Sequence, residues 1–286
     1  MRIRFFSYRL LGGILLICVL IWRCNLDQGL EFGNPSETIS HGIKGSIVFS
    51  GAWSQDITEV RLVVSTTFPP DPAQPLDVFI FSDPIQVGVR SVDYGISLSP
   101  ATYQIIAVIF RERNQPWDLS NIMAVHSPLS ACTIIPDLSQ AVVVESETSV
   151  IDSVDLDVDL SKGSISGEIA FVGAWPADIN FAGIVAFENP IDFSNLAPPC
   201  GLAILPLDVE NAQYKIRVPP NDYLLLVIAG SSLADLVETL INNEGGGDIT
   251  QILSLIRGIH LAPIAVQSQQ DTPNINITVD WNTALK

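Results

Sequence analysis

The sequence predicts an all-β protein built from two tandem antiparallel β-sandwiches, with a short helical insertion in the second. The first observation is an internal repeat: residues 45–53 (GSIVFSGAW) return as residues 167–175 (GEIAFVGAW), at an offset of 167 − 45 = 122 residues. Extended to Ile57 and Ile179, the two copies agree at 8 of 13 positions. The second observation is a series of short apolar segments separated by Pro- and Gly-containing loops, which is typical of stacked antiparallel sheets.

Residues 1–23 have the composition of an export signal. Three arginines precede an apolar run at 10–22, which is 13 residues long. A helix that spans a membrane needs about 20 apolar residues, whereas a basic start followed by a short apolar run is typical of a secretory signal. We therefore expect residues 1–23 to be a signal peptide and the polar residues 24–42 to be a tether.

Residues 21–24 (IWRC) resemble the lipobox of bacterial lipoproteins, in which the cysteine becomes the lipidated first residue. This resemblance makes Cys24 the candidate lipidation site and implies a membrane anchor. The family prefers a small residue where Arg23 stands, so a plainly secreted protein and an uncleaved N-terminal anchor stay as alternatives.

The first repeat is expected to span residues 43–160. Alternating apolar residues predict strands at 45–50 and 60–65, and segments 94–98 and 103–110 predict a hairpin. The closing segment at 154–160 alternates strictly, so its three aspartates, Asp155, Asp157 and Asp159, should share one solvated face. This spacing fits a strand rather than an EF-hand loop; a calcium-binding surface is the alternative to a solvated face that blocks edge pairing.

The second repeat is expected to span residues 161–286. Segments 214–218 and 223–228 predict the same hairpin, with Tyr214 at an offset of 214 − 94 = 120 residues. The repeat differs by an insertion at about 232–257, where apolar residues recur at helical spacing in two stretches and Gly258 suits a helix end.

The net charge of −17 makes nucleic-acid binding improbable, because such a surface repels phosphate backbones. Of the four cysteines, Cys132 and Cys200 fall in the repeats. In an oxidising compartment they can form one disulfide bond between the repeats. Two buried free thiols are the equal alternative.

No catalytic set is found in the sequence, and we expect no enzyme activity, metal or cofactor. The three histidines, His41, His126 and His260, have no second ligand at metal-binding spacing. Trp53 and Trp175 each follow Gly-Ala after the first strand of a repeat. Such a tryptophan either closes the end of the core or contacts a sugar or a partner, so both are candidate ligand contacts.

The repeated Gly-x-Ile-x-Phe-x-Gly-Ala-Trp segment and the later Tyr-x-Ile motif resemble the carboxypeptidase-regulatory-like, transthyretin-like domains of bacterial envelope proteins. Residues 218–223 (VPPNDY) look like their turn before a tyrosine, without its usual glycine. The resemblance covers nearly all of residues 43–282 and implies sandwiches of transthyretin-like or immunoglobulin-like type more than it implies a function. Together these observations predict a non-enzymatic, exported, lipid-anchored structural or binding module of the cell envelope, with an unknown envelope protein or glycan as partner. The alternative is a carbohydrate- or peptide-binding accessory factor for an envelope enzyme or transporter.

Overall fold

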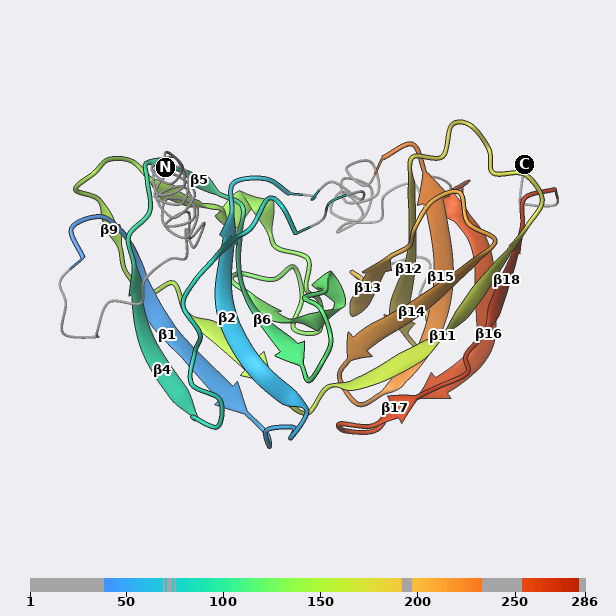
Figure 1. The fold of residues 1–286 in the computed structure, drawn as a ribbon, viewed down its shortest axis with the longest axis horizontal. Coiled ribbons are helices and arrows are strands. Elements are labelled where there is room, and N and C mark those ends of the chain that lie inside the picture. Colours follow the sequence, from blue (N-terminus) through green and yellow to red (C-terminus); the bar gives the residue numbers. More distant parts are fainter. Residues whose placement is uncertain are drawn as a thin grey trace, which may run out of the picture.

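The computed structural model describes residues 39–68, 70, 74, 76–191, 197–232 and 254–282. The expected signal peptide, Cys24, most of the tether and most of the helical insertion lie outside these residues. The described chain is an all-β protein that forms two β-sandwiches side by side, as predicted (Figure 1). Within the described ranges, no helix is long and apolar enough to span a membrane.

Two facing sheets and a short ribbon form the first half of the chain. Its strands are β1 (Gly42–Ser50), β2 (Ile57–Ser65), β3 (Ile80–Phe81), β4 (Ser91–Ile96), β5 (Ala101–Tyr103), β6 (Ile105–Glu112), β7 (Ile122–Val125), β8 (Val142–Val144), β9 (Val150–Ile151) and β10 (Leu156–Asp159). Two 3-10 helices complete this half: η1 (Leu119–Asn121) directly precedes β7, and η2 (Leu138–Gln140) precedes β8. The sheets run β10-β1-β4, with β9 also on β1, and β3-β2-β6-β7, while β5 pairs with β8.

The second half repeats this plan with fewer strands. Its strands are β11 (Gly163–Val172), β12 (Phe181–Glu188), β13 (Gly201–Ile204), β14 (Asn211–Val218), β15 (Asp222–Gly230), β16 (Ile256–Ala265), β17 (Asp271–Thr272) and β18 (Ile277–Asp280). One sheet runs β14-β11-β17, with β18 also on β11, and the other runs β13-β12-β15-β16. In each half the closing strand lies parallel to the opening strand, pairing Phe49 with Val158 and Phe171 with Val279. β9 also pairs with β1 in parallel, and β17 with β11, so each half combines parallel pairs on its opening strand with antiparallel pairs elsewhere.

The sequence repeat is also a repeat of tertiary contacts. Trp53 Nε1 donates to the Val89 carbonyl at 2.9 Å, and Trp175 Nε1 donates to the Val209 carbonyl at 2.9 Å. The recurrence of glycine at positions 45 and 167 has a steric cause, because a Cβ on Gly167 would lie 2.0 Å from the Ile275 carbonyl oxygen. The segment that leads into the closing strand therefore approaches the opening strand where only glycine leaves room.

The predicted hairpins are wrong, because the two segments of each belong to different sheets. β4 pairs with β1 while β6 pairs with β2, and β14 pairs with β11 while β15 pairs with β12. The intervening turn instead carries the chain from one sheet of the sandwich to the other. A tyrosine fixes this crossing: the Tyr103 hydroxyl donates to the Ser99 carbonyl at 3.0 Å, and the Tyr223 hydroxyl donates to the Pro219 carbonyl at 2.8 Å.

We expect Tyr223→Phe to lower the free energy of unfolding by about 1 kcal/mol, since it removes one hydrogen bond and leaves the Pro219 carbonyl without that donor. Tyr103→Phe should have a similar effect in the other repeat. Urea unfolding at equilibrium measures both changes. An unchanged unfolding midpoint for both variants would show that the hydroxyls do not hold the crossing.

Strands β6 and β15 are nearly continuous apolar runs because both of their faces are buried. On β6, Ile106, Val108 and Phe110 face the core of the first sandwich, whereas Ile105, Ala107 and Ile109 join a second cluster on the outer face. β15 and β12 likewise contribute to the second core and to an outer cluster. The two outer clusters meet around a small apolar cavity whose walls include Ile134, Ile135, Leu202 and Ile204. The two sandwiches therefore pack through the outer faces of one sheet each.

The expected helix end near Gly258 is wrong. Ile256 and Gly258 belong to β16, where Ile256 pairs with Ile228 and Gly258 pairs with Val227. Ile256 is buried in the outer cluster of the second sandwich. Its spacing from Ile252 suits a helix, but the apolar face of β15 offers it a strand position.

Candidate functional site

The two sandwiches are joined by a short linker and by several polar and covalent ties, which include hydrogen bonds from Gln269 to the Ala52 carbonyl and from Arg217 to Asn121. The linker, residues 160–162, ends in Lys162, whose ammonium group donates to the Met123 carbonyl at 2.9 Å. Glu112 at the end of β6 forms ion pairs with Arg217 and, at 3.5 Å, with Lys215 of β14. A disulfide bond joins Cys132 of the first half to Cys200 of the second. These ties hold the facing surfaces of the two sandwiches at a fixed separation.

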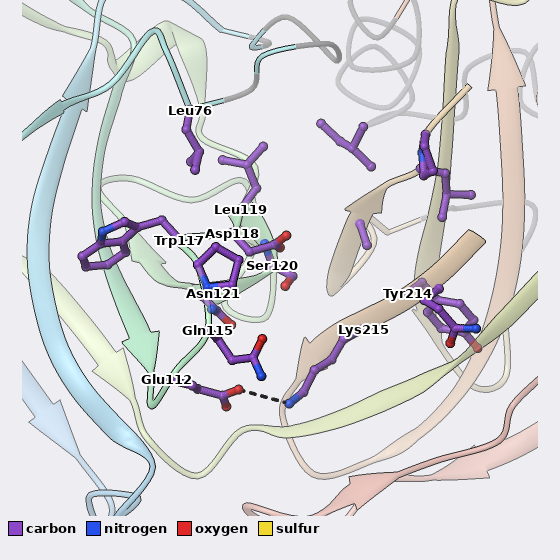
Figure 2. Close-up of a pocket in the computed structure, with 16 residues that line it drawn as sticks. Leu76, Glu112, Gln115, Trp117, Asp118, Leu119, Ser120, Asn121, Tyr214 and Lys215 are labelled. Carbon is purple, nitrogen blue, oxygen red and sulfur yellow. Dashed lines mark hydrogen bonds and ion pairs between the residues drawn. The ribbon is translucent and has the colours of Figure 1, made fainter. Parts of the chain in front are cut away.

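A cleft of about 590 Å³ lies between these surfaces. Its walls are Leu76, Glu112 and residues 115–121 on the first half, and residues 203–206 and 213–215 on the second. Figure 2 shows the Glu112–Lys215 ion pair at one end of this cleft, with Leu76 at the other. A volume of this size is within the range of small-ligand and peptide sites in proteins.

The first wall is held rigid by its own contacts. The Asp118 carboxylate accepts a hydrogen bond from the Ser120 amide at 2.7 Å and so caps η1. The Trp117 ring packs on Phe81, with ring centroids 5.4 Å apart, and beneath the Arg111 guanidinium. Because Trp117 is fixed against the first sandwich, the residues that follow it present Asp118 and Ser120 to the cleft (Figure 2).

The second wall consists of two edge strands, β13 and β14, which end their respective sheets. Tyr214 is buried, and its hydroxyl donates to the Ile275 carbonyl at 2.6 Å. The flanking residues Gln213 and Lys215 reach the outer face. Burial raises the pKa of the Tyr214 hydroxyl, so it stays protonated through the physiological range.

Below the cleft, a smaller cavity of about 180 Å³ is lined by charged residues from both halves. Burial lowers the pKa of Lys162 to about 8, although Asp159 opposes this effect. Lys162 as a whole is half-buried, and its ammonium group is held by the Met123 carbonyl. Burial also lowers the pKa of the Arg217 guanidinium, and Glu112 partly restores it.

Stability is expected to rise with pH above about 8 because of Lys162. In the unfolded chain this lysine keeps its proton up to its ordinary pKa of 10.5, whereas the native protein releases it near 8. Between these values the unfolded state binds more protons, so the contribution to stability rises by at most about 1.4 kcal/mol per pH unit. Urea unfolding of the native protein and Lys162→Met from pH 7 to 10 measures it. Equal pH slopes for the two proteins would contradict this effect.

The structure places the predicted ligand contacts, Trp53 and Trp175, at the ends of the two cores. The Trp53 ring packs on Phe49 with centroids 4.7 Å apart, and the Trp175 ring packs on Phe171 at 4.6 Å. Both are partly buried against the core, and both indole N–H groups donate to backbone carbonyls. Neither tryptophan lines the cleft.

The aspartates of the closing strand are placed as the alternation indicated. Asp157 is exposed, and Asp155 accepts hydrogen bonds from the Ser46 amide at 2.7 Å and from the Ser46 hydroxyl at 2.9 Å. These bonds lower the pKa of Asp155. Its carboxylate thus joins β10 to β1, and Asn276 makes the equivalent bond to the Glu168 amide at 2.9 Å.

A Ser–His–Glu group of side chains lies on the described surface, away from the cleft. The Ser40 hydroxyl lies 3.0 Å from His41 Nδ1, and His41 Nε2 lies 3.5 Å from Glu147. Ser40 and Glu147 are exposed, so water has free access to these three side chains. The Glu188 carboxylate lies near Cys132 and Cys200, but their sulfurs are bonded to one another.

The cleft residues were not among the candidates from the sequence. Residues 112–121 and 203–206 have no counterpart motif in the other repeat, and they meet only because the two sandwiches pack together. The proline and polar residues at 115–120 are typical of a loop and form no motif. The one usable signal was the apolar character of both faces of β6, which indicates that another part of the protein packs on the outer face of its sheet.

No family model and no curated protein sequence matches this chain. Among solved structures, the TIE protein of Bacillus anthracis has 8% identity and a TM-score of 0.21; the match covers 82% of this chain and 34% of that one. A Bacteroides ovatus protein provisionally described as an adhesin has 10% identity and a TM-score of 0.24, with 67% and 78% coverage. The tip fimbrial protein Mfa3 from Porphyromonas gingivalis has 9% identity and a TM-score of 0.22, with 67% and 78% coverage. TM-scores this low do not establish a common fold.

Proposed function

We propose that this protein is an exported, non-enzymatic binding module of the cell envelope, and that the cleft between its two sandwiches is the ligand site. The cleft is the observation that supports this function. Its two walls come from separate sandwiches, and a disulfide bond, the Glu112 ion pairs and the Lys162 hydrogen bond fix them. A site that is formed before the ligand arrives loses little entropy on binding.

Filling the cleft tests this function. Gln115 is exposed and lines the cleft, so Gln115→Trp should occupy part of its volume without disturbing either core. Gln140, in η2 and outside the cleft lining, offers the matched control Gln140→Trp. Binding to glycan and peptide arrays should be lost in the first variant and kept in the second. Equal binding by the two variants would place the ligand elsewhere.

The proposed anchor is a lipid on Cys24. Support comes from the basic start, the short apolar run and the lipobox-like residues before Cys24. Intact mass spectrometry of the protein from envelope and medium fractions tests it. A mature form that begins at Cys24 with an added diacyl- or triacyl-glyceryl mass is expected in the envelope. A cleaved form without lipid in the medium would make the protein a secreted module instead.

A carbohydrate-binding accessory role, with Trp53 and Trp175 as contacts, is the second candidate. It is supported by the two tryptophans, which hold equivalent positions in the two repeats and keep part of each ring accessible. Under this role, Trp53→Ala and Trp175→Ala abolish glycan binding while each variant stays folded. Under the cleft proposal, the same variants lose stability but keep their ligand.

A further inference from the structure

Among the described residues, no strand pairs with the outer edge of β14. β14 ends its sheet, and its register with β11 places Tyr214 opposite Gly167. The Phe171 amide bonds to the Glu210 carbonyl at 2.8 Å, which identifies these two residues as a hydrogen-bonded pair. Because such pairs alternate along an antiparallel ladder, the N–H and C=O groups of Gln213 and Lys215 point away from β11. No other backbone group in the described ranges bonds to them.

This edge opens into the cleft rather than onto bulk surface. Residues 213–215 line the cleft, and residues 115–121 of the first sandwich stand opposite. A strand added to β14 would lie about 4.8 Å from it, with its own N–H and C=O groups meeting those of Gln213 and Lys215. The outward N–H and C=O groups of these two residues can therefore form hydrogen bonds with the backbone of an extended peptide.

The charge of the cleft indicates which peptide fits. Asp118 is exposed on the opposite wall, and the chain as a whole carries a net charge of −17. Lys215 is already paired with Glu112, so it leaves little positive charge for an acidic ligand. A basic side chain on the incoming strand would meet the Asp118 carboxylate, and the acidic surface would speed its arrival.

We propose that the cleft binds an extended, basic peptide segment of a partner protein as an additional strand on the free edge of β14. This inference rests on the proposed binding function and specifies its ligand. It assigns the backbone of Gln213 and Lys215 as the main contact and Asp118 as the residue that selects for basic side chains.

The first repeat supplies a matched control within the same chain. β4 is the counterpart of β14, and it too ends its sheet. By the same alternation, with Phe49 and Arg90 as a bonded pair, the backbone groups of Asp93 and Gly95 point outward. This second edge does not line the cleft. Asp93→Pro therefore blocks a free edge of the same kind where the proposal expects no ligand.

The test uses the mature, disulfide-bonded protein labelled with nitrogen-15 and the acetylated, amidated peptide Thr-Lys-Val-Lys-Thr-Val. At saturation we expect the amides of Gln213 and Lys215 to exchange with solvent at least tenfold more slowly, while those of Asp93 and Gly95 do not change. Gln213→Pro removes one donor and should weaken binding at least tenfold, whereas Asp93→Pro should bind as the native protein does. The peptide with glutamate in place of both lysines should bind more weakly.

Several outcomes would overturn the inference and leave the binding function intact. Peptide binding that protects β4 or another surface would place the site elsewhere, and so would equal affinity of Gln213→Pro and the native protein. The inference would also be overturned if a glycan bound to the native protein but not to Gln115→Trp, and no peptide bound to either. If instead neither peptide nor glycan responds to Gln115→Trp, the binding function itself fails. Exchange in the native protein decides the matter even if a proline variant does not fold.

Discussion

Replacing both Cys132 and Cys200 with serine is expected to lower the free energy of unfolding by about 4 kcal/mol. The bond closes a loop with a sequence separation of 68 residues, and in the chain-entropy model a cross-link of this length stabilises by about that amount. It also ties the segment after β7 to the residue before β13, so its loss should loosen one wall of the cleft. Urea unfolding of the variant and of the native protein measures the difference.

Thiol titration of the unfolded protein, before and after reduction, is the accompanying control. We expect no free thiol from Cys132 or Cys200 before reduction and two after it. Single Cys132→Ser should then match the double variant in stability, because either change removes the bond. Two titratable thiols before reduction, with a loss well under 1 kcal/mol in the double variant, would show that the cysteines are unpaired in solution.

The sequence was informative wherever a pattern repeated within one strand. The Gly-Ala-Trp segments located the opening strands, and the strict alternation of 154–160 located the closing strand β10. Strand pairing was harder to predict from the sequence, because periodicity shows which face of a strand is buried but not which strand lies beside it. Segments 94–98 and 103–110 therefore suggested a hairpin, although β4 and β6 lie in opposite sheets.

The cleft could not be predicted for a related reason. Its two walls are separated by about ninety positions in the sequence, and the one repeated motif that reaches them, at Tyr214, indicates a strand and no site. Ile256 shows a different limit, since apolar residues three and four apart suit a helix until a neighbouring strand provides a partner. Ion pairs between the halves, such as Glu112 with Arg217, have no signature along the chain at all.

Glu112→Ala is expected to lower the free energy of unfolding by about 2–3 kcal/mol. The change leaves two cations, Arg217 and Lys215, side by side at the interface without their carboxylate. Removing one partner of a fully buried ion pair costs about 3–5 kcal/mol. The cost is smaller here because the Glu112 side chain keeps 23% of its surface exposed and water screens part of the repulsion.

Glu59→Ala is the matched control, because Glu59 also pairs with two arginines, Arg61 and Arg111, but does so within the first sandwich. Both variants should lose stability, whereas only Glu112→Ala should change the separation of the two sandwiches in small-angle X-ray scattering.

A double-mutant cycle of Glu112→Ala with Arg217→Ala separates the pair from its surroundings. Arg217 also lies over the Phe110 ring at 4.5 Å, so its own replacement removes packing as well as charge. We expect a coupling energy of at least about 1 kcal/mol, since the removal of Glu112 should matter less once Arg217 is gone. A coupling near zero, with unchanged scattering in Glu112→Ala, would mean that contacts other than the Glu112 ion pairs set the width of the cleft.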